Sequence, residues 1–590
     1  MEKAAEFINK ISIRIVTLIF GVILLYLTVL SLLSTSVRGV QFHIDDAGKE
    51  VGTSTVFFIA DYPWKHLLFG TVIMALFLLL QFWIKRMKHQ GAIKKIVQPA
   101  VLCGLLFVFS VIYILSAKHY PGSDPAKLMK AAAELLAGDF HQFETGEYMH
   151  RYPFQSGFVL YICLFLKAFG EQSYLFIQII NAAALAAAYY YISKIICIIW
   201  EEDGKRYAAV NTVFMILFIP MFFYITFVYG NLLGFMLAML AIYHELLFFR
   251  DQKYYRILLA SLFIALAIIF KNNYLVVMVA MLLLLAVKFF KEKKKLVLIC
   301  FAASILGCYL ISGQLLALTM KSILGFELPA GLPKSTWVVM GLSEGGVAPG
   351  HFNGRSVSLY KENNYDYQAT NQAAIEKVVS RLNGYWEDKK KGLDFFGRKQ
   401  ASQWSEPTFQ CFSTLSAPTG EGILVNWSEN LRAGRGSLIV VKLLNIYQTF
   451  LFVGALLYLF LYQGKRKAEE LIFAIIFIGG FLFHFFWEAK SQYVLFYFVL
   501  LIPYATYGYM KLARSITKFT DRWKNRDFHF EREKLHKKTL LTCGIVLILI
   551  LAMGFFSRTS VFQYILTPRS DAEAMESYQR NVNNKLGKES

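Results

Sequence analysis

Charged residues are scarce in this chain. Only 17% of its 590 residues are Asp, Glu, Lys or Arg, whereas 56% are hydrophobic. A soluble protein of this size could not bury so much apolar surface. Apolar runs of about 18 to 25 residues recur along the sequence, which is the length needed to cross about 30 Å of hydrocarbon. Because these runs are continuous rather than alternating, they predict an all-α polytopic membrane protein and not a membrane β-barrel.

Cysteine is also scarce. The chain has seven cysteines, and their spacing fits neither a disulfide framework nor a metal site. No internal repeat of the kind found in transporters with inverted halves is visible. From the spacing of the cysteines we expect no metal and no other cofactor. Most of the cysteines lie inside apolar runs, namely Cys103, Cys197, Cys300, Cys308 and Cys543.

Acidic residues are fewer than basic ones. The chain has 61 Lys and Arg against 40 Asp and Glu, which gives a net charge of +21. In a nucleic-acid-binding protein we would expect this excess to gather in a soluble domain. Here most basic residues lie in short segments between apolar runs, where Lys and Arg mark the cytoplasmic side of a membrane. The charge therefore indicates topology rather than a nucleic-acid partner.

The alternation of these basic segments predicts about thirteen spans of the plasma membrane, with the N-terminus in the cytoplasm and the C-terminus outside. The first span, 13–33, is too long for a signal peptide and is not followed by a cleavage site. The predicted parts are two extra N-terminal transmembrane helices in 1–97, a transmembrane module in 98–319 with an outer loop at 117–172, an extracellular loop domain of mixed structure at 320–437, C-terminal transmembrane helices in 438–556 with a basic cytoplasmic loop at 511–538, and an extracellular tail at 557–590.

Two short helices are predicted at the outer membrane surface. Asp124 is expected outside and Lys205 inside, so the chain must cross the membrane an odd number of times between them. Two apolar stretches are available, 155–169 and 173–200, and only one of them can be a span. The shorter stretch therefore lies in the outer interface. With the amphipathic stretch 124–138 before it, the outer loop holds two juxtamembrane helices.

Asp124 is the candidate for catalysis. It stands in a Ser-Asp-Pro sequence, which is a typical helix start, so its carboxylate could simply cap the helix. Alternatively it serves as a general base that faces a cleft at the outer surface. A rival acidic pair, Asp45 and Asp46, is more simply explained as part of a solvated loop. Asp139 follows the same helix as Asp124 and is a possible supporting residue.

Two lysines stand in tight outer turns, where lysine is usually avoided. Lys271 lies in the sequence IIFKNNY, and Lys490 lies in FFWEAKSQY beside Glu488. Either lysine could reach toward lipid headgroups. Together they could also clamp a lipid phosphate. The large loop at 320–437 contains no catalytic triad and no metal motif, although its composition is typical of an ordered segment.

These patterns resemble a known family, the GT-C glycosyltransferases. Within it, the chain is similar to the branch of protein O-mannosyltransferases and lipid A aminoarabinose transferases, and the sequences FVYGN and WEAKSQY look like its Gram-positive bacterial members. The resemblance covers roughly 98–509. The residues that carry it are Asp124, Gly138, Asp139, Phe140, Tyr152, Pro153, Phe169 and Gly170.

The resemblance implies an inverting glycosyltransferase on the outer face of the membrane. Its donor would be a polyprenyl-phosphate sugar, and its acceptor a cell-wall polymer, a glycolipid or a protein of the envelope. Asp124 would be the base, and Lys271 and Lys490 would offset the charge of the donor phosphate. The family often has a second acid where this chain has Asn231, which favours a mechanism without a metal. The possible supporting residues are Asp139, Tyr152, Asn231 and Glu488.

Two other functions remain open at this stage. The chain could be a transporter or flippase of lipid-linked sugars, although ionisable residues are scarce within its spans. It could also be a non-catalytic scaffold for envelope assembly. For the transporter and for the scaffold, the expected partners would be membrane lipids or envelope components. Replacing Asp124 by Asn separates these functions, because only a transferase should lose turnover while it still binds its donor.

Overall fold

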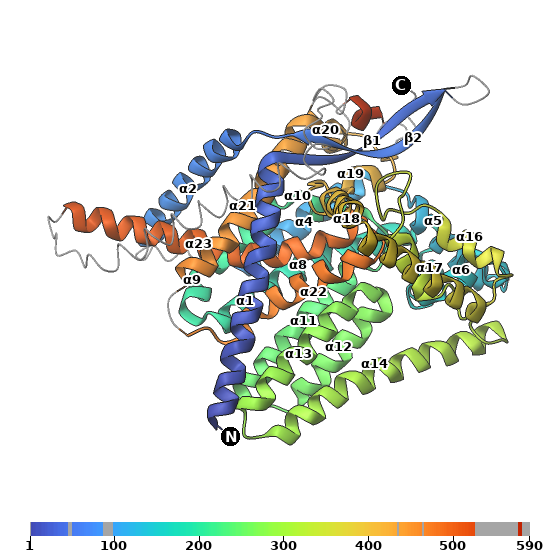
Figure 1. Ribbon diagram of the computed structural model, residues 1–590, viewed down its shortest axis with the longest axis horizontal. Helices are drawn as coiled ribbons and strands as arrows, with labels where there is room; N and C mark the ends of the chain where they lie inside the picture. The colour runs from blue at the N-terminus through green and yellow to red at the C-terminus, as the bar shows by residue number, and fades with distance from the viewer. Residues whose placement is uncertain are drawn as a thin grey trace.

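The computed structural model describes residues 2–44, 50–86, 98–432, 436–462, 465–524 and 576–580. These residues form long helices and one two-stranded sheet (Figure 1). The elements up to the outer loop are α1 (Glu2–Leu33), β1 (Ser34–Ile44), β2 (Glu50–Ala60), α2 (Pro63–Arg86), α4 (Pro99–Ala117), α5 (Ser123–Leu136), η2 (His141–Phe143), α6 (Tyr148–Arg151), η3 (Pro153–Gln155), α7 (Ser156–Phe169), η4 (Gly170–Gln172) and α8 (Ser173–Ile199).

The remaining elements are also helical. The first group consists of α9 (Glu201–Leu217), α10 (Ile219–Phe223), η5 (Tyr224–Thr226), α11 (Asn231–Asp251), α12 (Tyr255–Phe270), η6 (Asn272–Tyr274), α13 (Leu275–Lys291) and α14 (Lys295–Leu324). The second consists of α15 (Lys334–Gly341), α16 (Arg355–Glu362), α17 (Tyr367–Glu387), α18 (Lys389–Trp404), α19 (Cys411–Thr414), α20 (Ile423–Arg432), α21 (Gly436–Leu461), η7 (Ala468–Leu471), α22 (Ile472–Phe486) and α23 (Ser491–Lys524).

Nine helices within the described residues are long and apolar enough to cross a membrane. A tenth candidate is the pair of α9 and α10–η5, which is bent by 65°, and two shorter apolar helices occupy Pro63–Leu79 and Tyr255–Phe270. Every predicted span within the described residues corresponds to one of these helices. The last predicted span, at 539–556, lies outside the described residues, so the number thirteen stays a prediction. The protein is a multi-pass helical membrane protein.

The two short helices of the outer loop are present as α5 and α7. Together with α8, α7 belongs to one apolar stretch, Pro153–Ile199, of 47 residues. At 1.5 Å per residue this stretch is about twice as long as the hydrocarbon core requires. The apolar face of α5 packs on α7 through Leu128, Ala132 and Phe158, which are all buried. α5 ends before Gly138, whose φ of 77° suits glycine.

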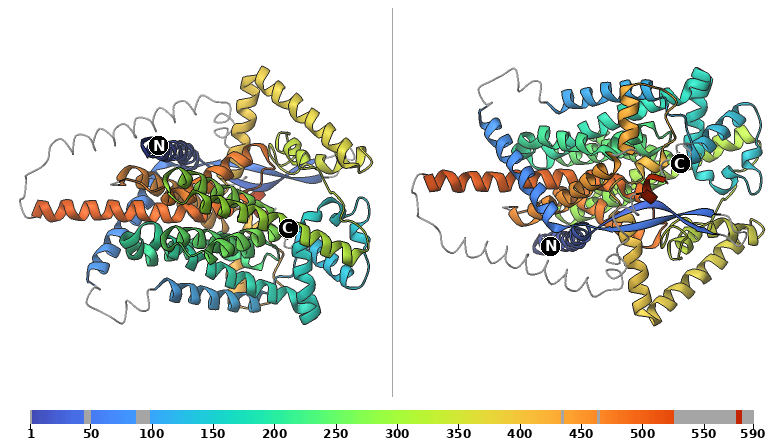
Figure 2. Two further views of the ribbon diagram at one scale, coloured as in Figure 1. Left: turned by 90° about the horizontal axis from the view of Figure 1, so that it is seen from below. Right: turned by 90° about the horizontal axis from the view of Figure 1, so that it is seen from above.

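Figures 1 and 2 place α5, α6, α16 and α17 at one end of the molecule and the C-terminal end of α23 at the other. α23 runs for 34 residues and continues to Lys524, through half of the segment that the sequence analysis treats as a basic loop. Lys511 and Arg514 on this extension form ion pairs with Asp203 near the start of α9, with distances of 2.6 and 3.4 Å. These groups therefore lie together at the end opposite Asp124.

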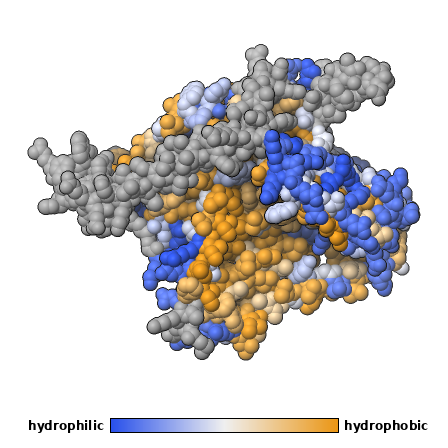
Figure 3. Space-filling view, viewed as in Figure 1, coloured by the Kyte–Doolittle hydropathy of each residue, from blue (hydrophilic) through white to orange (hydrophobic). Residues whose placement is uncertain are grey.

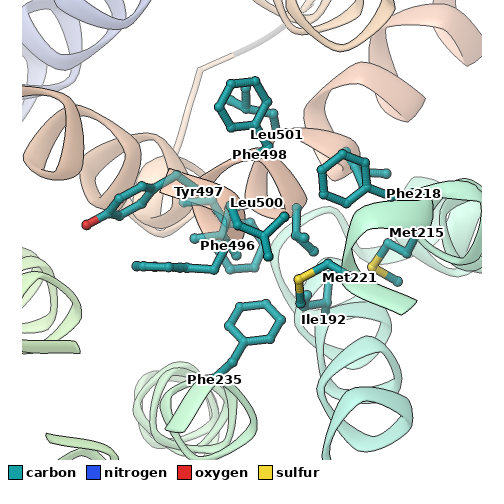
Figure 4. Close-up of a cluster of buried hydrophobic side chains, with 14 of the residues drawn as sticks. Ile192, Met215, Phe218, Met221, Phe235, Phe496, Tyr497, Phe498, Leu500 and Leu501 are labelled. Atoms are coloured by element: carbon teal, nitrogen blue, oxygen red, sulfur yellow. The ribbon is translucent and has the colours of Figure 1, made fainter. Parts of the chain in front are cut away.

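The segment 320–437 is helical in its described residues, which contain no strand, whereas the sequence predicted mixed structure. The segment also packs directly on the membrane helices. Trp404, fully buried, contacts the rings of Phe477 and Phe481 on α22 and Phe498 on α23, with centroid distances of 5.5, 5.1 and 5.8 Å. The core beneath it is aromatic and aliphatic and joins α23 to α8–α11 (Figure 4).

The strands occur instead between α1 and α2, on either side of the segment for which the sequence predicts a solvated loop. β1 and β2 form an antiparallel hairpin that pairs Ser34 with Ala60 and Ile44 with Glu50. The hairpin is bonded to segment 320–437 through Ser36 N–H to the Ser405 carbonyl at 3.1 Å. A two-stranded hairpin alone is only marginally stable, so this contact matters for its formation. The tip of the hairpin, with Asp45 and Asp46, lies outside the described residues.

The surface of the molecule divides into apolar and polar regions. Figure 3 shows a broad hydrophobic face over the long helices, next to a hydrophilic region where Figure 1 places α16 and α17. On α14, for example, Leu310, Ile311, Leu315 and Leu318 are each about 60% exposed. Such a face is suited to contact with lipid.

Candidate functional site

A cavity of about 550 Å³ lies at the end of the molecule that carries α5 and α6. Segments far apart in the sequence form its walls, and we call it the site cavity. Its charged lining residues are Asp124 and Lys127 from α5, Arg151 from α6, Arg38 from β1, and Glu488 and Lys490 from the turn between α22 and α23. Its other polar and aromatic lining residues include Tyr148, Tyr152, Phe154, Gln155, Tyr229, Trp337, His351, Gln410 and Tyr493.

Asp124 does not cap its helix. The residue that precedes the first turn of α5 is Gly122, and no side chain makes a capping hydrogen bond there. Ser123 has a φ of 55°, an unusual value for a residue other than glycine, and Asp124 follows it into the first turn. The carboxylate is partly buried and lines the site cavity. Of the two explanations that the sequence left open, capping therefore does not apply.

Tyr148 presents its hydroxyl to Asp124. Burial raises the pKa of Tyr148 strongly, and the nearby Asp124 carboxylate raises it further, so the phenol keeps its proton. Gln155 Nε2 donates to the Tyr148 hydroxyl oxygen at 3.0 Å. Since that oxygen is already an acceptor, its own proton is available for the carboxylate. The Tyr148 hydroxyl is therefore a potential hydrogen-bond donor to Asp124.

Lys271 lies behind two aromatic rings of the cavity wall. It stands where α12 ends and η6 begins, and its Nζ is 4.1 Å from the centroid of the Tyr229 ring and 5.8 Å from that of Tyr493. Burial lowers the pKa of Lys271 to about 7. The charge of Asp124 acts in the opposite direction, and that of Lys490 adds to the lowering. Lys271 thus lies within electrostatic reach of both residues.

Lys490 and Glu488 form an ion pair on the cavity wall, with Nζ and Oε1 3.2 Å apart. Glu488 is 4% exposed, and its other oxygen accepts a hydrogen bond from the Tyr493 hydroxyl at 3.2 Å. The predicted residues Asp124, Tyr152, Glu488 and Lys490 are therefore all brought to one cavity. A group with a negative charge could enter here by competing with Glu488 for Lys490.

The turn with Glu488 and Lys490 is held from behind by α18. Lys399 is completely buried, and its Nζ donates to the carbonyls of Gly341, Phe485 and Trp487 at 2.6, 2.9 and 2.8 Å. Three acceptors use all three N–H bonds of an ammonium group. Burial lowers the pKa of Lys399 to about 7. A fourth bond from α18 runs from Gln403 Nε2 to the Lys490 carbonyl at 3.1 Å.

A second buried polar group brings Arg38 to the cavity. The carboxylate of Glu406 accepts from the hydroxyl of Ser491, the first residue of α23, at 2.7 Å and from Gln410 N–H at 2.8 Å. The side-chain oxygen of Gln410 in turn accepts from Arg38 Nη1 at 3.3 Å. The hairpin, segment 320–437 and α23 thereby share one hydrogen-bonded network at the cavity wall.

Two predicted supporting residues lie outside the cavity lining. Asp139 is exposed, and its carboxylate accepts from the backbone N–H of His141 at 2.9 Å. Asn231 opens α11, and its backbone carbonyl accepts from the Tyr274 hydroxyl. Within the described ranges, no group of three or more His, Cys, Asp or Glu residues is placed to hold a metal ion.

Sequence reasoning did not find Arg38, Tyr148, Trp337 or Lys399. For Arg38 a signal exists, because STSVRGVQFHI is rich in the β-branched and aromatic residues that are typical of a strand. Nothing in the sequence around Lys399 distinguishes it from the exposed lysines on the same helix. Its role depends on the approach of Gly341 and the end of α22, which are far away in the chain.

No protein-family model and no curated protein matches the chain. Among solved structures, it is similar to the oligosaccharyltransferase of Archaeoglobus fulgidus in the apo form, with 13% identity and a TM-score of 0.40 over 84% of this chain and 57% of that one. Two further structures of that enzyme match with TM-scores of 0.38 and 0.37, at 12% and 13% identity.

Of these two, one has a tethered acceptor peptide with an NVT sequon, and covers 81% of this chain and 55% of that one. The other is a complex with an inhibitory peptide and a dolichol-phosphate, and covers 80% and 56%. The chain thus spans a little over half the length of the oligosaccharyltransferase. TM-scores below 0.5 do not establish a shared fold, so the function proposed below rests on the site cavity.

Proposed function

We propose that this protein is a glycosyltransferase of the GT-C type that moves a sugar from a polyprenyl-phosphate donor to an acceptor at the outer face of the plasma membrane. The observation that carries the proposal is the site cavity itself. One partly buried carboxylate, Asp124, shares it with Lys490 and lies within electrostatic reach of Lys271. A base beside a cationic pair is what attack on a sugar phosphate requires.

The reaction is a single displacement. The acceptor hydroxyl oxygen forms a bond to the anomeric carbon while the bond from that carbon to the phosphate oxygen breaks. The hydroxyl proton passes to Asp124, and the polyprenyl phosphate leaves with the electron pair of the broken bond. Because the attack comes from the side opposite the leaving group, the anomeric configuration inverts.

Each side chain has a place in this scheme. Tyr148 orients the Asp124 carboxylate, since its hydroxyl faces that group. Lys490 binds the donor phosphate by exchanging Glu488 for the incoming anion. Lys271 adds a second positive charge through the wall formed by Tyr229 and Tyr493. We propose that these cations stabilise the leaving phosphate and that no metal ion is required.

The arrangement favours transfer over transport or scaffolding. A transporter site should lie between helices near the middle of the membrane and open to both sides. Asp124 instead stands on a short helix of the outer loop, at the end of the molecule opposite the Asp203–Lys511 ion pair. A scaffold has no use for a partly buried carboxylate that shares a cavity with a tyrosine and lysines.

The test is sugar transfer by the purified protein in nanodiscs, with a panel of polyprenyl-phosphate sugars and a membrane extract as the source of acceptors. We expect Asp124→Asn to lower transfer at least 100-fold, as expected for loss of a general base, while polyprenyl-phosphate binding changes little. Asp139→Asn is the matched control, because this carboxylate lies in the same outer loop but is exposed and outside the cavity lining.

Three outcomes would contradict the proposal. Equal transfer by the wild type and Asp124→Asn would move the chemistry elsewhere. Absence of transfer from every donor, together with flipping of lipid-linked sugars across the nanodisc or a vesicle, would favour transport. Loss of activity after treatment with EDTA, restored by a divalent cation, would show that a metal takes the role assigned here to Lys271 and Lys490.

A further inference from the structure

Two cations on the wall of the site cavity have no anionic partner among the residues that the structure describes. Lys127 is exposed and follows Asp124 by one turn of α5, and Arg151 is partly buried at the end of α6. Neither forms an ion pair with a described carboxylate. Arg151 Nε donates to the Glu147 carbonyl at 3.2 Å, and the guanidinium lies 5.7 Å from the Tyr152 ring. Lys127 Nζ lies 5.2 Å from the Tyr148 ring.

These two residues differ from other basic residues nearby. On the same helix, Lys130 is 3.5 Å from Glu134 and does not line the cavity. Lys490, which does line it, is paired with Glu488. Unpaired cations in a concave site concentrate anions, because the low-dielectric walls focus their field. Lys127 and Arg151 therefore make the Asp124 side of the cavity attractive to a negatively charged ligand.

An aromatic wall adjoins the two cations. Tyr152, Phe154 and Trp337 pack edge to face, with ring centroids 6.1 to 6.2 Å apart, and all three line the cavity. Trp337 is held in place by a parallel stack on Trp487 at 5.8 Å, and Phe154 remains 43% exposed. Rigid aromatic faces of this kind offer a large contact area to the C–H bonds of a sugar ring.

We infer that Lys127, Arg151 and this aromatic wall form the acceptor subsite, and that the acceptor is an anionic glycan whose sugar units carry phosphate or carboxylate groups. The inference rests on the function proposed above. In that scheme Lys271 and Lys490 bind the donor phosphate. Lys127 and Arg151 come from a different part of the chain, and we assign them to the acceptor. Asp124, the group that must accept the acceptor proton, lines the same cavity as Lys127, Arg151 and Lys490 and lies within electrostatic reach of Lys271.

The subsite can be tested without turnover. The full-length protein is placed in nanodiscs of zwitterionic lipid, and binding is measured for an oligogalacturonate, a phosphodiester-linked hexose oligomer and, as the neutral probe, the methyl ester of the oligogalacturonate. We expect both anionic probes to bind about tenfold or more tightly than the ester, since each charge-assisted contact contributes a factor of this order. Their affinity should fall with added salt.

Variants test which residues cause the preference for the anionic probes. Lys127→Gln with Arg151→Gln should abolish the preference for the anionic probes, whereas the matched variant Lys130→Gln should retain it. Phe154→Ala should weaken the acid and its ester alike. Polyprenyl-phosphate binding, measured on the same samples, should not change in the double variant, and this separates a failure of the subsite from a failure of the proposed function.

Three results would overturn the inference. The first is equal binding of the acid and its ester. The second is a double variant that keeps the preference for the anionic probes. The third is that no anionic glycan probe binds in zwitterionic lipid, while the wild type binds anionic lipid and the double variant does not. In that case the two cations serve a lipid headgroup.

Discussion

Replacing Lys399 by methionine should loosen the turn that carries Glu488 and Lys490. The variant keeps most of the volume of the side chain but removes all three hydrogen bonds from Nζ to the carbonyls of Gly341, Phe485 and Trp487. These carbonyls stay buried, and each unsatisfied buried acceptor costs about 1 to 3 kcal/mol.

The net effect is smaller than the sum of these costs. Removing a buried charge also removes the free energy that its desolvation cost, which offsets part of the loss. We therefore expect local opening of the turn to become easier by about 3 kcal/mol, which corresponds to about a 100-fold increase in the opening equilibrium. Opening would displace Lys490, so affinity for polyprenyl phosphate should fall in parallel.

Amide hydrogen exchange measures this opening directly. The N–H of Ala489 is bonded to the Gly350 carbonyl at 2.8 Å, so its exchange reports whether the turn remains docked on segment 320–437. Exchange of Ala489 should rise about 100-fold in Lys399→Met, whereas amides in the middle of α22 should not change. The matched control is Lys390→Met, because Lys390 is exposed on the same helix. Unchanged exchange of Ala489 would refute the role given to Lys399.

Two further predictions concern the turn at Lys271. Burial lowers the pKa of Lys271 to about 7, so Lys271 is charged below that pH and loses its attraction for phosphate as the pH rises through 7. Donor affinity should therefore fall above pH 7. Lys271→Arg, which stays charged throughout, should remove this part of the pH dependence. A Cβ on Gly230 would lie 2.0 Å from the Phe270 carbonyl oxygen, so Gly230→Ala should lower the free energy of unfolding by about 1 to 3 kcal/mol and weaken donor binding by displacing Lys271. Gly307→Ala should do neither, because a Cβ there has no neighbour within 4 Å. Equal thermal stability of the two variants would contradict the packing argument.

The sequence was sufficient for those parts of the site that depend on membrane topology. Lys271 and Lys490 are each in a short turn between membrane helices, and parity places both turns at the same face as Asp124. Helices of similar length then bring such turns to a common level. This is why three residues that are far apart in the chain could be predicted to lie at one face, and the structure places Asp124 and Lys490 within electrostatic reach of Lys271. That they act together stays a prediction.

The start of α5 shows where local reasoning was insufficient. The Ser-Asp-Pro pattern favoured a capping role for Asp124, because these residue types are typical at a helix start. The structure begins the helix after Gly122, so Asp124 lies inside the first turn and its carboxylate is left for the cavity. The competing contribution is tertiary: Asp124 lines a cavity whose walls come from distant segments of the chain, and capping statistics cannot include them.

The remaining wall of the site could not be predicted, because it is assembled from parts that depend on each other. The hairpin carries Arg38, yet two strands alone would be marginal in water, and Ser405 completes their hydrogen bonding. Arg38 reaches the cavity through Gln410, whose backbone is held by Glu406, and Glu406 also binds the start of α23 at Ser491. A chain of bonds of this kind has no local sequence pattern. It also means that the N-terminal region and segment 320–437 are structural parts of the site cavity, since Arg38, Gln410 and Lys490 all line it.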